Sequence, residues 1–98
     1  GQQIYAPDAD LILTNTVNPG AEVIADGCVH VYGALRGRAI AGAKGDAQAR
    51  VFCRRFEAEL VAVAGVYAVA EQMQGDLKGK PVQAYLADGK LKIERLEW

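Results

Sequence analysis

The sequence predicts an all-β domain built as a short solenoid, in which successive coils of the chain stack on one another. Its β-prone runs are only two to five residues long, too short to bury a core alone. Eleven glycines punctuate the chain, six of them between Gly20 and Gly45. One apolar pair also recurs every eighteen to twenty-two residues, as Leu11/Leu13, Val29/Val31 and Val51/Cys53. A stacked coil produces this recurrence because each rung buries its inward residues against the next rung.

The predicted strands follow from these runs in chain order. They are Leu11–Leu13, Val23–Ile24, Cys28–Tyr32, Arg38–Ala41, Val51–Cys53 and Leu60–Val63. Alternation places Val29 and Val31 on one side of a strand and His30 and Tyr32 on the other. A second stacked series is expected from Val23/Ile24, Ile40 and Val61. Turns between the faces are expected where positive φ or close backbone approach is needed, at Gly20, Gly27, Gly33, Gly37 and Gly42.

The segment Ala47–Ala64 also fits a helix. Phe52, Phe56, Leu60 and Val63 follow helical spacing, and Asp46 and Gly65 resemble an N-cap and a stop. Against the helix stand the β-rich run Leu60–Val63 and the continuation of the Leu11/Val29/Val51 series. Periodicity alone leaves both alternatives open.

The C-terminal tail predicts a polar link followed by a hairpin. The link covers Gln72–Lys80, and two β-like runs, Val82–Leu86 and Leu91–Leu96, flank Asp88-Gly89. Asp-Gly between alternating apolar residues is a strong hairpin signal. A solenoid needs a cap over its terminal rung. We expect one open end to be covered by Leu86, Leu91, Ile93 and Leu96.

Length and composition exclude several classes of protein. The 98 residues suit one domain, residues 1–98, and the net charge of −1 argues against a nucleic-acid partner held by clustered cations. No run of 18 apolar residues and no signal peptide occur. Cys28 and Cys53 are too few for a disulfide scaffold or a metal motif, and are expected to be reduced, buried side chains. Because the chain begins with glycine, we expect a fragment of a longer protein.

The residues offer little for catalysis. His30 is the only histidine, so no metal site with two or more histidines can form, and its alternation with valines predicts an outward-facing strand residue. The carboxylate pairs Asp8/Asp10 and Glu57/Glu59 lack the long groove of β-helical lyases. The glycine-rich segments match no nucleotide-binding motif. We therefore expect no catalytic residue, cofactor or metal.

Arg36 and Arg38 are the best binding candidates that spacing alone offers. Two guanidinium groups at i and i+2 lie on one strand face and present fork-shaped donors to carboxylates on a partner. Two arginines that contact only solvent would have the same spacing, so the sequence leaves this alternative open.

The order of residues resembles the C-terminal domain of the MinC family over essentially the whole chain. The similar stretches are Ile4–Pro7, Asp10–Ile12, Gly20–Gly27, Val29–Gly33, Arg36–Asp46 and Glu59–Tyr67. The most specific block reads Gly-x-x-x-Gly-Arg-Ala-x-Ala-Gly-Ala from Gly33. This resemblance implies a right-handed β-helix of triangular cross-section, which favours strands over the helix at Ala47–Ala64.

The resemblance also implies a function. Domains of this family form homodimers and bind ATP-bound MinD, a membrane-associated ATPase, which carries the division inhibitor from the bacterial cytoplasm to the inner membrane and the septal FtsZ ring. A separate N-terminal domain, absent here, inhibits FtsZ directly. The resemblance thus implies a septum-placement module with no enzymatic activity, reaching the membrane only through MinD and FtsZ only indirectly or weakly.

Site residues follow from the same resemblance. The MinD-contacting element of the family begins Arg-Ser-Gly-Gln, of which Gly1 and Gln2 are present, and a second part matches Arg38 and Arg36. For the dimer interface we expect outward residues of the Leu60–Tyr67 stretch: Leu60, Val61, Val63 and Tyr67. Sequence leaves open whether Leu60/Ala62 or Val61/Val63 points outward. The alternative functions are a self-assembling scaffold of the bactofilin kind and a small β-helical enzyme.

Overall fold

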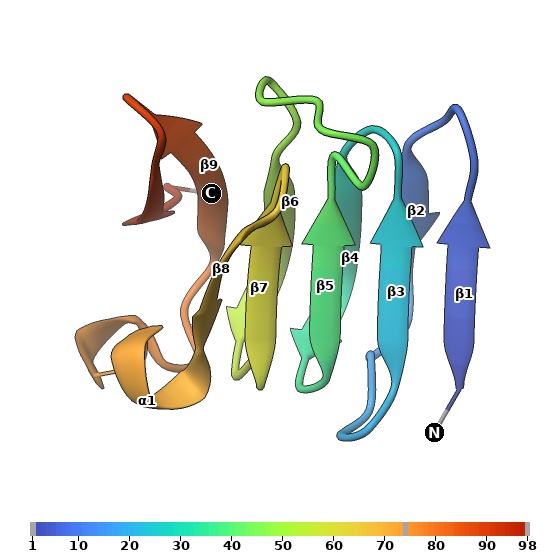
Figure 1. The fold of residues 1–98 in the computed structure, drawn as a ribbon. Coiled ribbons are helices and arrows are strands. Elements are labelled where there is room, and N and C mark those ends of the chain that lie inside the picture. The colour runs from blue at the N-terminus through green and yellow to red at the C-terminus, as the bar shows by residue number, and fades with distance from the viewer. Residues whose placement is uncertain (1, 74, 98) are drawn as a thin grey trace.

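The computed structural model describes residues 2–73 and 75–97. In this part of the chain short strands alternate with turns, and one helical segment interrupts them (Figure 1). The elements are β1 (Gln3–Ala6), β2 (Leu11–Leu13), β3 (Glu22–Ala25), β4 (Val29–Leu35), β5 (Arg38–Ala41), β6 (Val51–Phe56), β7 (Leu60–Val63), β8 (Val66–Val69), α1 (Ala70–Met73), a 3-10 turn (Gly75–Leu77), β9 (Val82–Ala87) and β10 (Lys90–Arg95).

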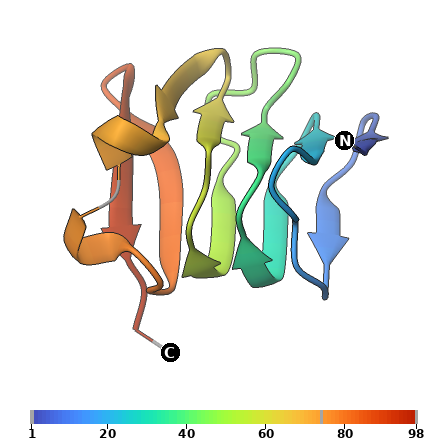
Figure 2. The same cartoon turned by 90° about the horizontal axis from the view of Figure 1, so that it is seen from below.

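The strands form two sheets that share one hydrophobic core. The first sheet has the order β1-β3-β5-β7-β8 and the second the order β10-β9-β6-β4-β2. Neighbouring rungs pair in parallel, whereas β8, β9 and β10 join antiparallel at the C-terminal end. Figure 2 shows this end of the row of coils opposite the N-terminus. The predicted hairpin cap is therefore confirmed.

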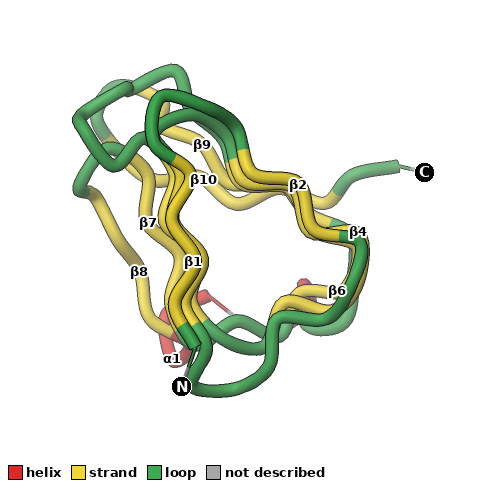
Figure 3. The backbone as a smooth tube through the Cα atoms, turned by 90° about the vertical axis from the view of Figure 1, so that its right-hand side faces the viewer, coloured by secondary structure: helices red, strands yellow, loops and turns green. Residues whose placement is uncertain are grey.

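A third face closes the cross-section between the two sheets. Strands β4 and β6 change register between Val31 and Ala34, and beyond this corner Leu35 pairs with Phe56 on one side and Val17 on the other. Figure 3, seen along the stack, shows the resulting three-sided outline. Its interior is filled by the side chains of Val29, Val31, Leu35, Val51, Phe56, Val61 and Val63. The predicted β-helix of triangular cross-section is confirmed.

Register confirms one predicted series and corrects the other. Leu11, Val29 and Val51 are stacked partners, as predicted. In the first sheet Val23, Ala39 and Val61 stack inward, whereas Ile24 and Ile40 face outward. The predicted pairing of Ile40 with Val61 is wrong by one position. Val61 pairs with Ala39 on the inward side, and Ile40 pairs with Ala62 on the outward side.

Glycines lie where two chains approach closely or φ is positive. A Cβ on Gly33 would lie 2.8 Å from the carbonyl carbon and oxygen of Asn15 in the preceding rung. Gly20 and Gly42 instead have φ values of 83° and 58°. Both roles predicted for the glycines therefore occur.

The structure rejects the helical alternative for Ala47–Ala64. The segment contains β6 and β7, each paired with strands on both sides. Phe52 faces outward against His30, and Phe56 faces the core. Their helical spacing is a coincidence, because the two rings lie on opposite sides of one strand and tertiary pairing decides the conformation.

The tail holds more structure than its sequence indicates. The hairpin turn is formed by Asp88 and Gly89, with φ of 52° and 74°, as in turns whose twist matches the flanking strands. The predicted polar link, Gln72–Lys80, instead contains the end of α1 and the whole 3-10 turn, and buries Met73. Strands β1 and β8 were not predicted either.

Candidate partner-binding surfaces

The outer side of the first sheet carries an apolar row that crosses all its strands. Register aligns Tyr5, Ile24, Ile40, Ala62 and Tyr67 across the sheet. Tyr5 and Tyr67 are 47% and 65% exposed, and the two isoleucines are half-buried. An apolar row on a flat face, with an exposed tyrosine at each end, is typical of a protein–protein contact.

A second row on the same side changes from polar to apolar. It aligns Gln3, Glu22, Arg38, Leu60 and Val69. The Gln3 amide donates to Glu22 Oε1 at 2.6 Å, and Glu22 Oε2 lies 3.9 Å from Arg38 Nη1. The Arg38 side chain is 48% exposed and holds Glu22 only at long range. Its other donors are therefore available to a partner.

Arg36 lies on the adjoining corner, in the turn between β4 and β5. Its Nε donates to Glu57 Oε1 at 2.7 Å, and Arg55 Nη2 lies 3.7 Å from Glu57 Oε2. The Arg36 hydrogen bond lowers the pKa of the Glu57 carboxyl below its ordinary value. Arg36 is thus already engaged, unlike Arg38. A shallow hollow of about 450 Å³ opens beside it, lined by Pro19, Arg36, Glu57, Glu59 and Lys78.

The structure places three of the four predicted MinD-contacting residues, Gln2, Arg36 and Arg38, where strands β1 and β5 of the first sheet begin. The Gln2 carbonyl accepts the Glu22 amide at 2.8 Å, so Gln2 lies one strand from β3 and two from Arg38. Arg36 lies two residues before Arg38 along the chain. Gly1 lies outside the described residues.

The predicted dimer residues separate into two groups. Leu60 and Tyr67 face outward, whereas Val61 and Val63 have no exposed surface and pack in the core. Val61 and Val63 therefore cannot contact a partner, because strand alternation turns Leu60 and Ala62 outward instead. Sequence reasoning missed Tyr5, Ile24 and Ile40. The correct register between rungs is the signal that would have placed these three residues on the outer side of the sheet.

The outer side of the second sheet is aromatic. The His30 ring stacks on Phe52 with centroids 4.8 Å apart and on Tyr32 at 6.1 Å. This confirms His30 as an outward-facing residue. The Arg50 guanidinium lies over the Tyr85 ring, 4.4 Å from its centroid, and also donates to Gln83.

A buried carboxylate fastens the loop that follows β5 to the first rung. Asp26 accepts the Tyr5 hydroxyl and the Asp8 amide, each at 2.7 Å, and Lys44 lies 3.4 Å away. These contacts, the Asp8 amide first, lower the pKa of Asp26. The hydrogen bond that the Tyr5 hydroxyl donates to Asp26 raises the pKa of Tyr5. The network is satisfied within the chain and links rungs.

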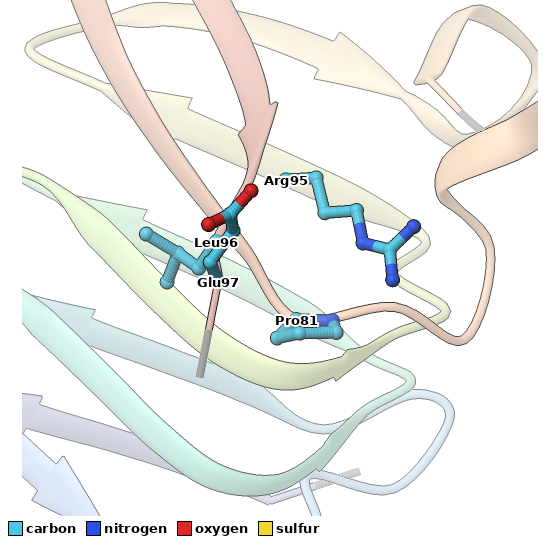
Figure 4. A pocket seen from close by; sticks show the side chains of 4 residues that line it. All are labelled: Pro81, Arg95, Leu96 and Glu97. Carbon is cyan, nitrogen blue, oxygen red and sulfur yellow. The ribbon is translucent and has the colours of Figure 1, made fainter.

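The described residues contain no cluster of three or more His, Cys, Asp or Glu placed to hold a metal ion. Burial raises the pKa of the Cys53 thiol to about 12, so this thiol stays protonated. A hollow of about 470 Å³ at the C-terminal end, lined by Pro81, Arg95, Leu96 and Glu97, combines one cation, one anion and two apolar side chains (Figure 4).

No helix of the described residues has the length and apolar character needed to cross a membrane. The domain is a β-helix with stacked rungs and flat outer faces suited to protein partners. We call the region of Gln2, Arg36 and Arg38 its arginine-bearing end. A family model described as "Septum formation inhibitor MinC, C-terminal domain" matches residues 1–96. The chain belongs to this family.

Individual relatives agree with this assignment. The chain is 55% identical over 97 residues to a probable septum site-determining protein MinC of Xylella fastidiosa strain M12, and 56% identical to one of Xanthomonas campestris pv. campestris strain B100. These matches cover 99% of the chain but 41% and 39% of the relatives, so the chain spans about two fifths of their length.

A solved structure is similar as well. A chain of the MinC:MinD cell division protein complex of Aquifex aeolicus matches with a TM-score of 0.88 and 32% identity, over 100% of this chain and 79% of that one. This likeness agrees with the family assignment.

Proposed function

We propose that residues 1–98 form the module through which a division-septum inhibitor dimerises and binds a MinD-type ATPase. The observation that carries this proposal is the likeness, over the whole chain, to a protein solved in complex with MinD. The module performs no chemical step itself. It connects an inhibitor of FtsZ assembly with the partner that determines where the inhibitor acts.

The arginine-bearing end is the proposed docking site for MinD. Glu22 lies between Gln2 and Arg38. Its amide donates to the Gln2 carbonyl, and its carboxylate accepts from Gln3 and lies 3.9 Å from Arg38 Nη1. Strand β5 is paired on both sides and holds Arg38 in place, so binding there orders few rotamers. Arg38 offers donors to a carboxylate or carbonyl on the partner, whereas Arg36 must first leave Glu57. We therefore expect Arg38 to contribute more than Arg36.

Nucleotide dependence enters through the partner. The chain has no motif for a nucleotide, so ATP must act by changing the MinD surface that docks here. The module would thus reach the inner membrane from the bacterial cytoplasm when MinD is ATP-bound, and would reach the septal FtsZ ring indirectly or weakly. No contact with nucleic acid is part of the proposal.

The apolar row on the first sheet is the proposed homodimer interface. Tyr67, Tyr5 and the isoleucines between them offer aromatic anchors on a flat face, and Leu60 and Val69 extend it. A two-fold arrangement would bring each copy's row against the other. Val61 and Val63 support this face from inside the core.

Docking is tested by co-sedimentation with MinD on lipid vesicles, with ATP and with ADP. Arg38→Ala should weaken ATP-dependent recruitment by at least roughly tenfold, the scale of an interface anchor, and Arg36→Ala by less. Arg95→Ala, an exposed cation near the C-terminus, is the matched control. Vesicles without MinD give the background to be subtracted. Equal recruitment of the Arg38 and Arg95 variants would contradict the proposed site.

Dimerisation is tested by sedimentation equilibrium without lipid. Tyr67→Lys should shift the chain to monomers, because it replaces the most exposed aromatic anchor of the apolar row with a charge. Tyr32→Lys makes the same change on the second sheet and should leave the dimer intact. Filaments of the unaltered chain alone would favour the scaffold alternative instead.

A further inference from the structure

The outer side of the second sheet holds apolar side chains that the proposed contacts do not use. Ile12 is 61% and Tyr32 is 42% exposed, and the half-buried His30 and Phe52 align with Ile12 in successive rungs, on β4 and β6. This aromatic face, defined by Ile12, His30, Tyr32 and Phe52, lies on a different side of the triangular stack from the apolar row of the first sheet (Figure 3).

Cations lie along one side of this aromatic face, toward β9 and β10. Arg54 is exposed on β6, two residues from Phe52, and Lys90 and Lys92 are exposed at outward positions of β10. Arg50 lies beside them on Tyr85. The described strands of the second sheet, β2, β4, β6, β9 and β10, contain one carboxylate, which is Glu94. A chain of net charge −1 thus presents a locally positive face.

The chemistry of this face limits what can bind there. Its central strands β4 and β6 are paired on both sides, so an extended peptide cannot add to them by strand pairing. The face instead combines a flat array of aromatic and aliphatic side chains with a basic rim. Tyrosine, phenylalanine and basic side chains in this arrangement match the boundary between anionic headgroups and acyl chains.

We infer that the aromatic face contacts the surface of an anionic phospholipid bilayer directly. Lys90, Lys92 and Arg54 attract the headgroups, and Ile12 with Tyr32 enters the interfacial layer. The inference goes beyond the proposed function, in which MinD alone links the module to the membrane, and rests on it for the local concentration near lipid. Each cation near an anionic surface strengthens partitioning about fivefold, so the contact is weak alone and effective once MinD holds the chain there.

Vesicle flotation with the chain alone tests the inference. The probes are phosphatidylcholine vesicles with no, 20% or 40% phosphatidylglycerol, at low and at physiological salt. Bound protein should increase with the anionic lipid and decrease with salt. Arg54→Glu/Lys92→Glu should reduce the partition coefficient at least tenfold. Lys78→Glu/Lys80→Glu, with the same charge change on the segment before β9, should retain most of the binding once corrected for net charge.

Several outcomes would overturn the inference. These are no binding to 40% phosphatidylglycerol at low salt, equal binding to neutral vesicles, and equal loss in both double variants. A shift of the Arg54→Glu/Lys92→Glu variant from dimer to monomer without lipid would assign the face to a second copy of the chain. Binding of an acidic peptide with no vesicle binding would assign it to a protein partner. Because no MinD is present, failure of the proposed docking cannot produce any of these results.

Discussion

Single residues decide whether adjacent coils can approach one another. Gly33 lies at the corner of β4, where an added Cβ would meet the Asn15 backbone at 2.8 Å. A backbone neighbour cannot rotate away as a side chain can, so the whole preceding coil would have to shift. The absence of a side chain at this corner is therefore a packing requirement and not one of φ.

Gly33→Ala should destabilise the fold by about 1–3 kcal/mol, the range for overpacking. Gly45→Ala is the comparison, because Gly45 has open space but a φ of 100° and so meets only backbone strain. Guanidinium unfolding of both variants measures the difference. A smaller loss at Gly33 than at Gly45 would show that the coils can separate without cost.

Asp26 gives the fold a dependence on acid. Its pKa is lowered in the folded chain, so its stabilising contribution is complete above the unfolded value of about 4 and disappears as pH falls through the lower folded value. Asp26→Asn should reduce the free energy of unfolding at neutral pH, and the difference from the unaltered chain should shrink below about pH 4. Urea unfolding between pH 2 and 7 measures this.

The control for Asp26 is Asp76→Asn, which removes one carboxylate from the 3-10 turn. It should leave the pH profile of unfolding nearly unchanged. If both substitutions changed the profile equally, net charge and not the Tyr5–Asp8–Lys44 contacts would explain the acid sensitivity.

Elements in this fold depend on their neighbours for their conformation. The sequence of β6 is compatible with a helix, and only its pairing with β4 and β9 selects the strand. The hairpin of β9 and β10 was predictable because Asp88-Gly89 specifies its turn locally. Strand β8 was not, because no local signal shows that the chain reverses at Ala64-Gly65 to pair with β7.

Leu35 tests whether the third face contributes to the common core. It is fully buried after the β4 corner and pairs with Val17 and Phe56. Leu35→Ala should cost about 2–5 kcal/mol in the free energy of unfolding, because the neighbouring coils cannot collapse into the cavity. Ile12→Ala, at a 61% exposed site, should change it by less than about 0.5 kcal/mol. Equal losses would mean that this face is loosely packed.

For the whole molecule, sequence predicted the architecture better than the surfaces. The recurrence of Leu11, Val29 and Val51 sufficed for the stacked coil because inward positions repeat in every rung. The apolar row escaped prediction, since it depends on register between rungs of unequal length. A one-residue error, as at Ile40 and Val61, exchanges core and surface. Spacing identified Arg36 and Arg38 as candidates. It could not show that Arg36 forms a close ion pair with Glu57 while Arg38 lies 3.9 Å from Glu22.

The two ends of the stack differ, and this predicts a gradient of local stability. Strands β1 and β2 lie at the edges of their sheets with a neighbour on one side only. The edge strands at the other end, β8 and β10, also contact each other, and α1 packs against β8. In a stack held by nearest-neighbour contacts, opening begins where contacts are fewest. Amide hydrogen exchange should be fastest in β1 and β2 and slowest in β6. Uniform exchange would indicate all-or-none opening.

This asymmetry has a thermodynamic consequence for recognition. The residues proposed to meet MinD include Gln2, beside the first strand. If the first rung opens as predicted, the free partner meets a complete site only in molecules in which that rung is closed. Its apparent affinity is reduced by the fraction of molecules in which that rung is open. Once bound, the partner stabilises the rung through mass action. A substitution that merely tightens the first coil would therefore strengthen docking without touching the partner.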